Sequence, residues 1–448
     1  MTRIYSGAIT SVVVGLTLVG AAAAPAQAES TRSEQWFLDV MHAESMWRTS
    51  TGAGVTVAVI DTGVDPQNPD LKGRILAGKD LAEGLSGDAH TDYDGHGTGM
   101  AGLIAGTGAY AGGQGAFGLA PGVKILPIRL PDGSKANNGA AADAQFLKAT
   151  LVGIRYAADH GAKVINISQG VEDESEQLTN AVDYALRKGS LVFAAVGNTG
   201  DEDNSVQYPA GTPGVVGVGA VGKNLGKTAE SQHGPQVDVS APGDKMVHAC
   251  GGGTGLCETH GSSDATALAS ASAALIWAKH PDWTNNQVLR VMLNTIGGPT
   301  DGAKRNDGIG YGIVRPRIAL KNPGDPGPAD KYPLPDYPVA VSKPSKTAQA
   351  PDDASSAASK SPAGNTPLWT AAGIGAAALI GVGVAVGVTR RRKRRGAPPP
   401  TPPYPQAAPA APAPRYTHPY GPPQNHPTSH DPNSPYGGGR SQGTGPVA

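Results

Sequence analysis

Apolar positions along the chain alternate between short continuous runs and longer segments of helical periodicity. The runs are rich in β-branched residues, which predicts buried strands, and they fall at 54–60, 123–128, 163–167, 191–196 and 214–219. Apolar residues at helical spacing predict helices at 142–160 and 178–187. Buried strands that alternate with helices form a parallel sheet covered on both faces. We therefore predict an α/β fold of three layers with a mostly parallel central sheet.

The globular pattern ends near residue 322. Residues 323–367 are mostly Pro, Ala, Ser, Asp and Lys, a composition that cannot bury a core and is typical of an extended spacer. We assign the folded domain to residues 29–322 and expect its first residues to form a short extension that packs on it. The large apolar side chains of this extension include Trp36, Phe37, Met46 and Trp47.

Residues 368–388 form an uncharged apolar segment that is long enough to cross a bilayer as a helix, at roughly 31 Å. The basic run 390–395 follows directly. Such runs stay in the cytoplasm, so we predict a single-pass membrane protein with an extracellular domain and a Pro/Gly-rich cytoplasmic tail at 389–448. A nucleic-acid patch is the alternative for the basic run. The position of the run beside the span and the net charge of -1 argue against that alternative, and we expect no nucleic-acid partner.

The N-terminus has the features of an export signal. Arg3 precedes an apolar stretch, and Ala26-Gln27-Ala28 forms a cleavage pattern, which predicts a signal peptide at 1–28. An uncleaved membrane anchor is the alternative, but the stretch is short and rich in alanine. Export exposes the two cysteines, Cys250 and Cys257, to an oxidising space, which favours a disulfide between them over free thiols or a metal pair.

Two segments carry an acid and a histidine where strands and helices meet. Asp61 closes an apolar strand before a glycine turn, where a charge needs a partner. His96 lies between glycines at the start of a helix of small residues, and histidine moves protons near neutral pH. Taken alone, an aspartate in the position of Asp61 is more commonly a turn cap, and a loop histidine such as His96 is usually a polar surface residue.

Two further segments carry a hydroxyl and an amide. Ser263 opens a helix of small residues, which places its hydroxyl and N–H in the positive field of the helix N-terminus. Asn198 follows an apolar strand and could donate a hydrogen bond to an oxyanion. A serine N-cap and an Asn-Thr-Gly turn are the ordinary alternatives. The chain order Asp, His, Asn, Ser nevertheless matches one known arrangement of a catalytic triad.

These segments resemble the signature blocks of the subtilisin-like serine proteases, and the resemblance covers about residues 36–320. The resemblance implies a subtilisin-like fold in which Ser263 is the nucleophile, His96 the general base and Asp61 its orienting partner, aligned in one hydrogen-bonded line. It also implies that Asn198 and the Ser263 N–H form the oxyanion hole.

The segment Ser168-Gln169-Gly170 matches the strand edge that pairs with the substrate backbone in this family, which implies binding of an extended protein or peptide.

The sequence departs from the family pattern beside the nucleophile. Ser262, Asp264 and Ala267 replace the usual threonine, methionine and proline, and Gln169 stands where leucine is common. Ser262 offers a second hydroxyl, although the alignment favours Ser263. Asp264 adds a negative charge, and either it points outward or it slows the enzyme.

One subgroup is similar over the whole organisation of the chain. The mycosins, proteases associated with type VII secretion, combine a signal peptide, a subtilisin-like domain, a Pro-rich spacer and a C-terminal span. Segment 310–316 resembles the end of the mycosin domain, whereas the tail beyond Arg395 is not part of the pattern.

We therefore predict a secreted, membrane-anchored serine endopeptidase that acts through an acyl-enzyme, with the type VII secretion machinery as a possible partner. The alternative function is a subtilisin-like scaffold with little or no turnover. We expect no cofactor and no metal site, because no dense run of oxygen ligands is present. Acidic loops at 172–176 and 201–203 favour basic substrate groups, unless they are simply solvated loops.

Overall fold

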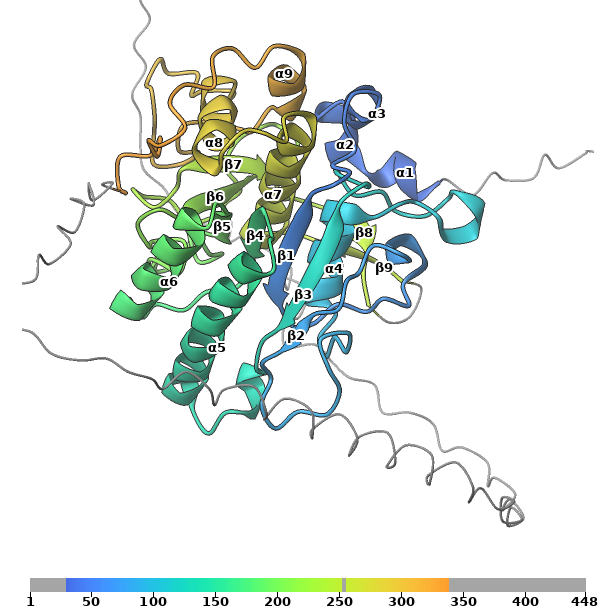
Figure 1. Ribbon diagram of the computed structural model, residues 1–448, viewed down its shortest axis with the longest axis vertical. Helices are drawn as coiled ribbons and strands as arrows, with labels where there is room; N and C mark the ends of the chain where they lie inside the picture. The colour runs from blue at the N-terminus through green and yellow to red at the C-terminus, as the bar shows by residue number, and fades with distance from the viewer. Residues whose placement is uncertain (1–29, 252–254, 338–448) are drawn as a thin grey trace, which may run out of the picture. The chain divides into compact units, whose positions relative to one another are not determined.

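A parallel sheet lies at the centre of the domain (Figure 1). The structure, a computed structural model, describes residues 30–251 and 255–337. The sheet has the strand order β2-β3-β1-β4-β5-β6-β7, and each pairing in it is parallel. Its strands are β1 Thr56–Asp61, β2 Lys79–Asp80, β3 Lys124–Arg129, β4 Val164–Ile167, β5 Leu191–Ala195, β6 Val216–Val221 and β7 Val239–Pro242.

Helices cover both faces of the sheet because side chains of successive strand residues point to opposite sides. In β1, Val57 and Val59 join one core cluster, and Ala58 and Ile60 join the other. The first cluster contains α4 (His96–Ala105), α7 (Ser262–Lys279), α8 (Asn285–Asn294) and α9 (Pro316–Lys321). The second contains α5 (Gly139–Asp159) and α6 (Glu176–Arg187), which lie side by side (Figure 1). The predicted three-layer α/β architecture is confirmed.

The N-terminal extension packs on the first cluster, as expected. It consists of α1 (Thr31–Glu34), α2 (Trp36–Val40) and α3 (Ala43–Trp47), and α3 contacts α9. Phe37 and Met46 are buried, and the indole N–H of Trp47 donates to the Leu119 carbonyl at 2.8 Å. The extension therefore belongs to the folded domain.

Packing also continues beyond residue 322, so the predicted boundary between domain and spacer is too early. Leu334 is buried in the core, and the Tyr332 hydroxyl donates to the Gly214 carbonyl at 2.7 Å. Arg290 donates to the carbonyls of Pro326 and Pro328 at 2.8 and 2.9 Å. The high proline content of this segment led us to predict an unfolded spacer. Prolines also restrict the backbone of the unfolded chain, so a few apolar contacts are enough to hold the extended segment on the domain.

A hairpin of two antiparallel strands, β8 (Met246–Ala249) and β9 (Leu256–Thr259), packs beside α4. Cys250 and Cys257 form a disulfide at its end, as the sequence indicated. Within residues 30–251 and 255–337, no helix is long and apolar enough to cross a membrane. The predicted signal peptide at 1–28 and span at 368–388 lie outside the described residues.

Candidate active site

The predicted catalytic residues meet at one edge of the sheet. Asp61 ends β1, Ser168 follows β4, and Asn198 follows β5, three strands that are neighbours in the sheet. His96 begins α4 and Ser263 lies in the first turn of α7. Because the carboxyl ends of parallel strands share an edge, residues far apart in the sequence converge there.

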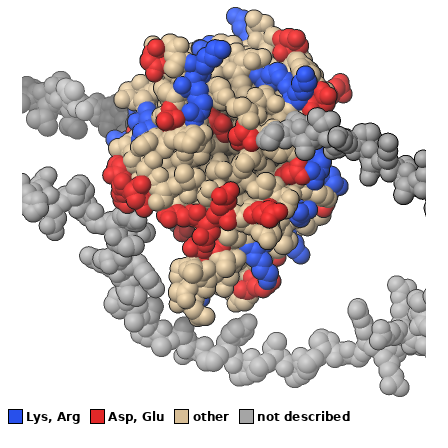
Figure 2. Space-filling model, turned by 90° about the vertical axis from the view of Figure 1, so that its left-hand side faces the viewer, with Lys and Arg blue, Asp and Glu red and all other residues tan. Residues whose placement is uncertain are grey.

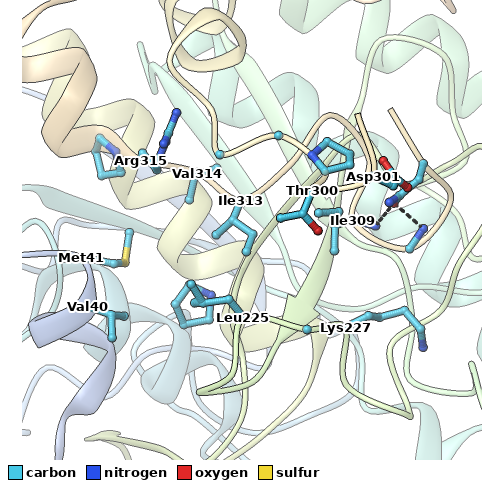
Figure 3. A pocket seen from close by; sticks show the side chains of 18 of the residues that line it. Val40, Met41, Leu225, Lys227, Thr300, Asp301, Ile309, Ile313, Val314 and Arg315 are labelled. Atoms are coloured by element: carbon cyan, nitrogen blue, oxygen red, sulfur yellow. Dashed lines mark hydrogen bonds between the residues drawn. The ribbon is translucent and has the colours of Figure 1, made fainter. Parts of the chain in front are cut away.

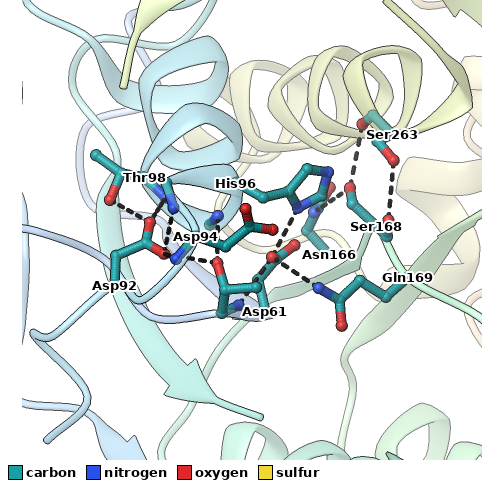
Figure 4. Close-up of polar contacts among 12 residues, drawn as sticks. Asp61, Asp92, Asp94, His96, Thr98, Asn166, Ser168, Gln169 and Ser263 are labelled. Atoms are coloured by element: carbon teal, nitrogen blue, oxygen red, sulfur yellow. Dashed lines mark hydrogen bonds and ion pairs between the residues drawn. The ribbon is translucent and has the colours of Figure 1, made fainter. Parts of the chain in front are cut away.

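Asp61 is fully buried, and one of its carboxylate oxygens accepts three hydrogen bonds (Figure 4). Oδ1 accepts from His96 Nδ1 at 2.7 Å, from the Thr62 N–H at 2.8 Å and from Gln169 Nε2 at 3.3 Å. Oδ2 is buried and has no hydrogen-bond partner among the described residues. This arrangement holds a carboxylate against one ring nitrogen of His96 and fixes which nitrogen faces away from it.

The glycine after His96 permits this contact. A Cβ atom at Gly97 would lie 2.1 Å from the Gly63 carbonyl oxygen and 3.1 Å from the Asp61 Cβ, so a side chain there would separate α4 from β1. Burial lowers the pKa of His96, but the charge and hydrogen bond of Asp61 outweigh it and raise that pKa to about 9. His96 is thus a basic imidazole with 28% of its side chain still exposed.

Asp92 organises the loop before His96, a role that the sequence analysis missed (Figure 4). Its Oδ1 accepts from the Gly95 N–H at 2.8 Å and the Thr62 hydroxyl at 2.7 Å. Its Oδ2 accepts from the Thr98 N–H at 2.8 Å, which caps the first turn of α4. An acid just before a glycine-rich helix start is the sequence signal that could have revealed it.

Ser263 lies across from His96, but its hydroxyl is turned toward Ser168 (Figure 4). Ser263 Oγ donates to the Ser168 carbonyl at 2.9 Å, and Ser168 Oγ donates to the Ser263 carbonyl at 3.1 Å. The expected single line from carboxylate to hydroxyl therefore forms only between Asp61 and His96. A rotation about one side-chain bond would redirect the hydroxyl, and such contacts often tighten only when substrate is present.

Ser262 and Asn198 form a second fixed unit. Asn198 Oδ1 accepts from the Ser262 N–H at 2.8 Å and from its hydroxyl at 2.9 Å. Since a backbone N–H can only donate, the bonded atom of the amide is its oxygen, and the Asn198 NH₂ group points elsewhere. Ser262 is fully buried whereas Ser263 is partly exposed, so only Ser263 presents its hydroxyl to the cleft.

The family comparison agrees with this geometry. The Subtilase family matches residues 52–312 of the chain. The chain belongs to the subtilase family. In this subtilase, Gly170 is exposed and makes no hydrogen bond to another described residue, which leaves its backbone open beside Ser168 and Gln169.

Similar proteins include characterised proteases. Fervidolysin of Fervidobacterium pennivorans is 34% identical over 66% of this chain, which spans only 45% of that protein. Thermitase of Thermoactinomyces vulgaris is 34% identical over 53% of this chain and 83% of its own length. The crystal structure of MycP1 from Mycobacterium smegmatis has a TM-score of 0.56 and 30% identity, and it covers 67% of this subtilase and 87% of that chain. MycP1 is a mycosin, so the structural comparison agrees with the resemblance of this sequence to the mycosins.

The subtilase has one departure that the sequence left open. Asp264 points inward and is 1% exposed, so the outward orientation that we considered is wrong. Its carboxylate accepts a hydrogen bond from the Thr259 hydroxyl in β9. The β8–β9 hairpin therefore supplies the partner that a buried acid at this position needs.

A cavity of about 610 Å³ lies away from this site (Figure 3). Val40 and Met41 of the N-terminal extension line it together with Leu225 and Ile313. None of the predicted catalytic or substrate-binding residues reaches it. The cavity is therefore separate from the predicted catalytic residues at the edge of the sheet.

Proposed function

We propose that the chain is a serine endopeptidase that hydrolyses peptide bonds through an acyl-enzyme. The observation that carries this proposal is the buried Asp61 carboxylate held against His96 Nδ1 at 2.7 Å, opposite the partly exposed Ser263 hydroxyl at the start of α7. Membership of the subtilase family supports it.

The reaction follows from the positions of these groups. A peptide lies along segment 168–170, and the Ser263 hydroxyl leaves the Ser168 carbonyl to face the scissile bond. His96 Nε2 accepts the hydroxyl proton as Oγ bonds to the carbonyl carbon, and Asp61 stabilises the imidazolium. His96 then donates that proton to the departing amine, which leaves an ester on Ser263. Water, deprotonated by His96, hydrolyses the ester and restores the enzyme.

The developing oxyanion needs donors that are fixed in advance. The Asn198 NH₂ group can provide one, because Ser262 holds the amide by its oxygen and the NH₂ group has no hydrogen-bond partner among the described residues. The Ser263 N–H at the N-terminus of α7 provides the second. Gly261 allows this arrangement, because a Cβ atom there would lie 2.7 Å from Asn198 Nδ2.

The substrate groove is acidic on one side. A hollow of about 440 Å³ at Gln169 and Gly170 is lined by Asp94, Asp132 and Asp143, and no Lys or Arg is among the described residues that line it. Loops 172–176 and 201–203 carry further exposed acids, and Figure 2 shows acidic side chains crowded together on one face. We infer a preference for substrates with basic residues near the scissile bond. A peptide library cleaved without preference for Lys or Arg would exclude it.

The same proposal extends to cellular role. A MycP1 structure is described as a serine protease and an essential component of the type VII (ESX-1) secretion system. Similarity to MycP1 over 67% of the chain, together with the predicted signal peptide and span, supports a mycosin-like protease anchored outside the membrane and linked to such a system.

Labelling with a fluorophosphonate probe tests the chemistry without an identified substrate. The full-length protein should be labelled, and Ser263→Ala should not. Ser262→Ala should keep labelling at a reduced rate, which distinguishes the two hydroxyls. A folded wild-type protein that resists the probe would favour the scaffold function instead.

A further inference from the structure

A chain of hydrogen bonds links three buried side chains directly behind the nucleophile. His248 in β8 contacts the Thr259 hydroxyl of β9 through Nε2 at 2.7 Å. The same hydroxyl bonds Asp264 Oδ1, one residue after Ser263. His248 and Asp264 are each 1% exposed, and Nε2 and Oδ1 lie 3.8 Å apart. The proposed mechanism uses none of these three groups.

The tautomer of His248 follows from its other contact. Nδ1 lies 2.9 Å from the Ala249 carbonyl oxygen, which can only accept. Nδ1 therefore carries a hydrogen, and the protonation state of the ring depends on Nε2 alone. Among the described residues, Nε2 has the Thr259 hydroxyl as its hydrogen-bond partner, and Asp264 Oδ1 lies farther away at 3.8 Å.

Counting hydrogens then fixes the charge of the network. The contacts from Nε2 to the Thr259 oxygen and from that oxygen to Asp264 each need one hydrogen, and the hydroxyl supplies one. The other must come from Nε2 or from the carboxyl group. An ionised Asp264 beside a neutral His248 would leave two lone pairs facing each other at one of the contacts.

We propose that Asp264 and His248 share one proton through Thr259, so that the pair stays neutral overall beside the reacting groups. This inference rests on the proposed function for its catalytic consequence. A bare carboxylate next to Ser263 would oppose the oxyanion that the Ser263 N–H must stabilise. Proton sharing removes that opposition while it keeps a polar anchor between α7 and the hairpin.

The surroundings hold the network in place. Gly99 of α4 faces the His248 ring, and a Cβ atom there would lie 2.8 Å from its Cε1. The ionisable groups that act on Asp264 and His248 among the described residues are each other and His96. Asp61, Asp264 and the exposed Asp94 act on His96. Asp264 also acts on His260 at the surface.

The first experiment measures stability against pH and needs no activity. The unfolding equilibria of full-length wild type and Asp264→Asn are compared between about pH 4 and pH 9. A shared proton means that folded wild type holds one more proton than the folded variant throughout this range. Above about pH 5, where Asp264 is ionised in the unfolded chain, wild type should then lose stability relative to the variant by about tenfold in the unfolding constant for each unit that the pH rises. Contributions of other groups cancel in the difference.

Parallel pH profiles of wild type and Asp264→Asn would overturn the proposal, because an ionised Asp264 beside a neutral His248 in the folded state gives that result. Asparagine can donate to Thr259 as the protonated acid does, so the variant should fold. A variant that fails to fold also counts against proton sharing.

The second experiment measures the catalytic consequence. The rate of fluorophosphonate labelling is followed against pH for wild type, Asp264→Asn and the control Asp94→Asn. Asp264→Asn should keep the wild-type pH of half-maximal labelling, because the pair carries no net charge in either protein. Asp94→Asn removes an exposed charge and should lower that pH by a few tenths of a unit. A downward shift in Asp264→Asn as large as that in Asp94→Asn, or larger, would show that the pair of Asp264 and His248 carries a net negative charge in wild type.

Absence of labelling in wild type would refute the endopeptidase, whereas the stability comparison would still decide the shared proton.

Discussion

Two aspartates pair with histidines in the described part of the protein, and the two pairs differ in how their groups meet. Asp61 contacts His96 directly at 2.7 Å, whereas Asp264 reaches His248 through the Thr259 hydroxyl. His96 keeps 28% of its side chain exposed at the cleft, while His248 is 1% exposed. We call Asp61 and His96 the open pair, because it faces the cleft, and Asp264 and His248 the sealed pair, because it is buried behind Ser263.

Solvent access and direct contact decide the charge of each histidine. At His96 the attraction of Asp61 outweighs burial and raises the pKa to about 9. At His248 burial has the larger effect and lowers the pKa, and burial also raises the pKa of Asp264. The comparison teaches that an aspartate beside a histidine makes a strong base only where the charged pair is in contact and partly solvated.

The two aspartates should therefore differ most in what their removal does to catalysis. Asp61→Asn should lower the rate of fluorophosphonate labelling by about 10⁴-fold, because the amide can no longer stabilise the His96 imidazolium. Asp264→Asn should lower it by less than about tenfold, because its pair is already neutral. Labelling rates of the purified variants at one pH provide the measurement. If the two variants lose similar fractions of the labelling rate, both aspartates must stabilise the protonated His96 directly.

The N-terminus of α7 lies between the two pairs and should show an intermediate effect. Asn198→Ala should lower the labelling rate by about 10²- to 10³-fold through loss of an oxyanion donor. Ser262→Ala should have a smaller effect in the same direction, because Asn198 keeps its side chain but loses one of two bonds that orient it. If Ser262→Ala proves the more damaging change, Ser262 must act by a route other than Asn198.

The residues of the open pair, together with Asn198 and Ser263, could be predicted from the sequence, since they lie in signature segments at strand and helix ends. The predicted strands and both predicted helices also appear in the structure with small shifts at their ends. Apolar periodicity and local motifs carry this information because the fold buries those strands on both faces.

The sealed pair could not be predicted in this way. The hairpin that supplies His248 and Thr259 is short and partly polar, so it has no strong periodicity. Its contact with Asp264 is visible only once α7 is placed against it. The orientation of the Ser263 hydroxyl toward Ser168 could not be predicted either, because it depends on the side-chain rotamer, which no sequence motif specifies.

The pH dependence of labelling should report the open pair. His96 must be neutral to accept a proton, and its pKa of about 9 means that labelling should rise about tenfold per pH unit up to about pH 9. The stability that His96 contributes has the opposite trend. Its folded pKa exceeds the unfolded value of about 6.5, so the contribution is complete below that pH and is lost as pH rises toward 9. A labelling midpoint near pH 6.5 would show that Asp61 does not raise the pKa.

Removal of the disulfide should have the smallest effect on labelling. It tests whether the hairpin is needed only for stability or also for the proton shared by His248 and Asp264. Cys250 and Cys257 are 7 residues apart, and closing so short a loop stabilises the fold by about 2–3 kcal/mol. The double variant Cys250→Ser, Cys257→Ser should unfold at a lower temperature by several degrees. Asn68 still holds the hairpin, because its amide donates to the carbonyls of Cys250 and Gly255 at 2.7 and 3.0 Å.

Labelling by the double variant should therefore stay within a few-fold of wild type at temperatures where the variant is folded, with an unchanged pH midpoint. The matched control is Ser205→Ala, which leaves the hairpin and its disulfide intact and should unfold as wild type does. A shifted pH midpoint of labelling in the double variant would mean that the disulfide keeps His248 and Asp264 in contact through Thr259. A loosened hairpin would release the proton that the two residues share, and the charge of Asp264 would then act on His96.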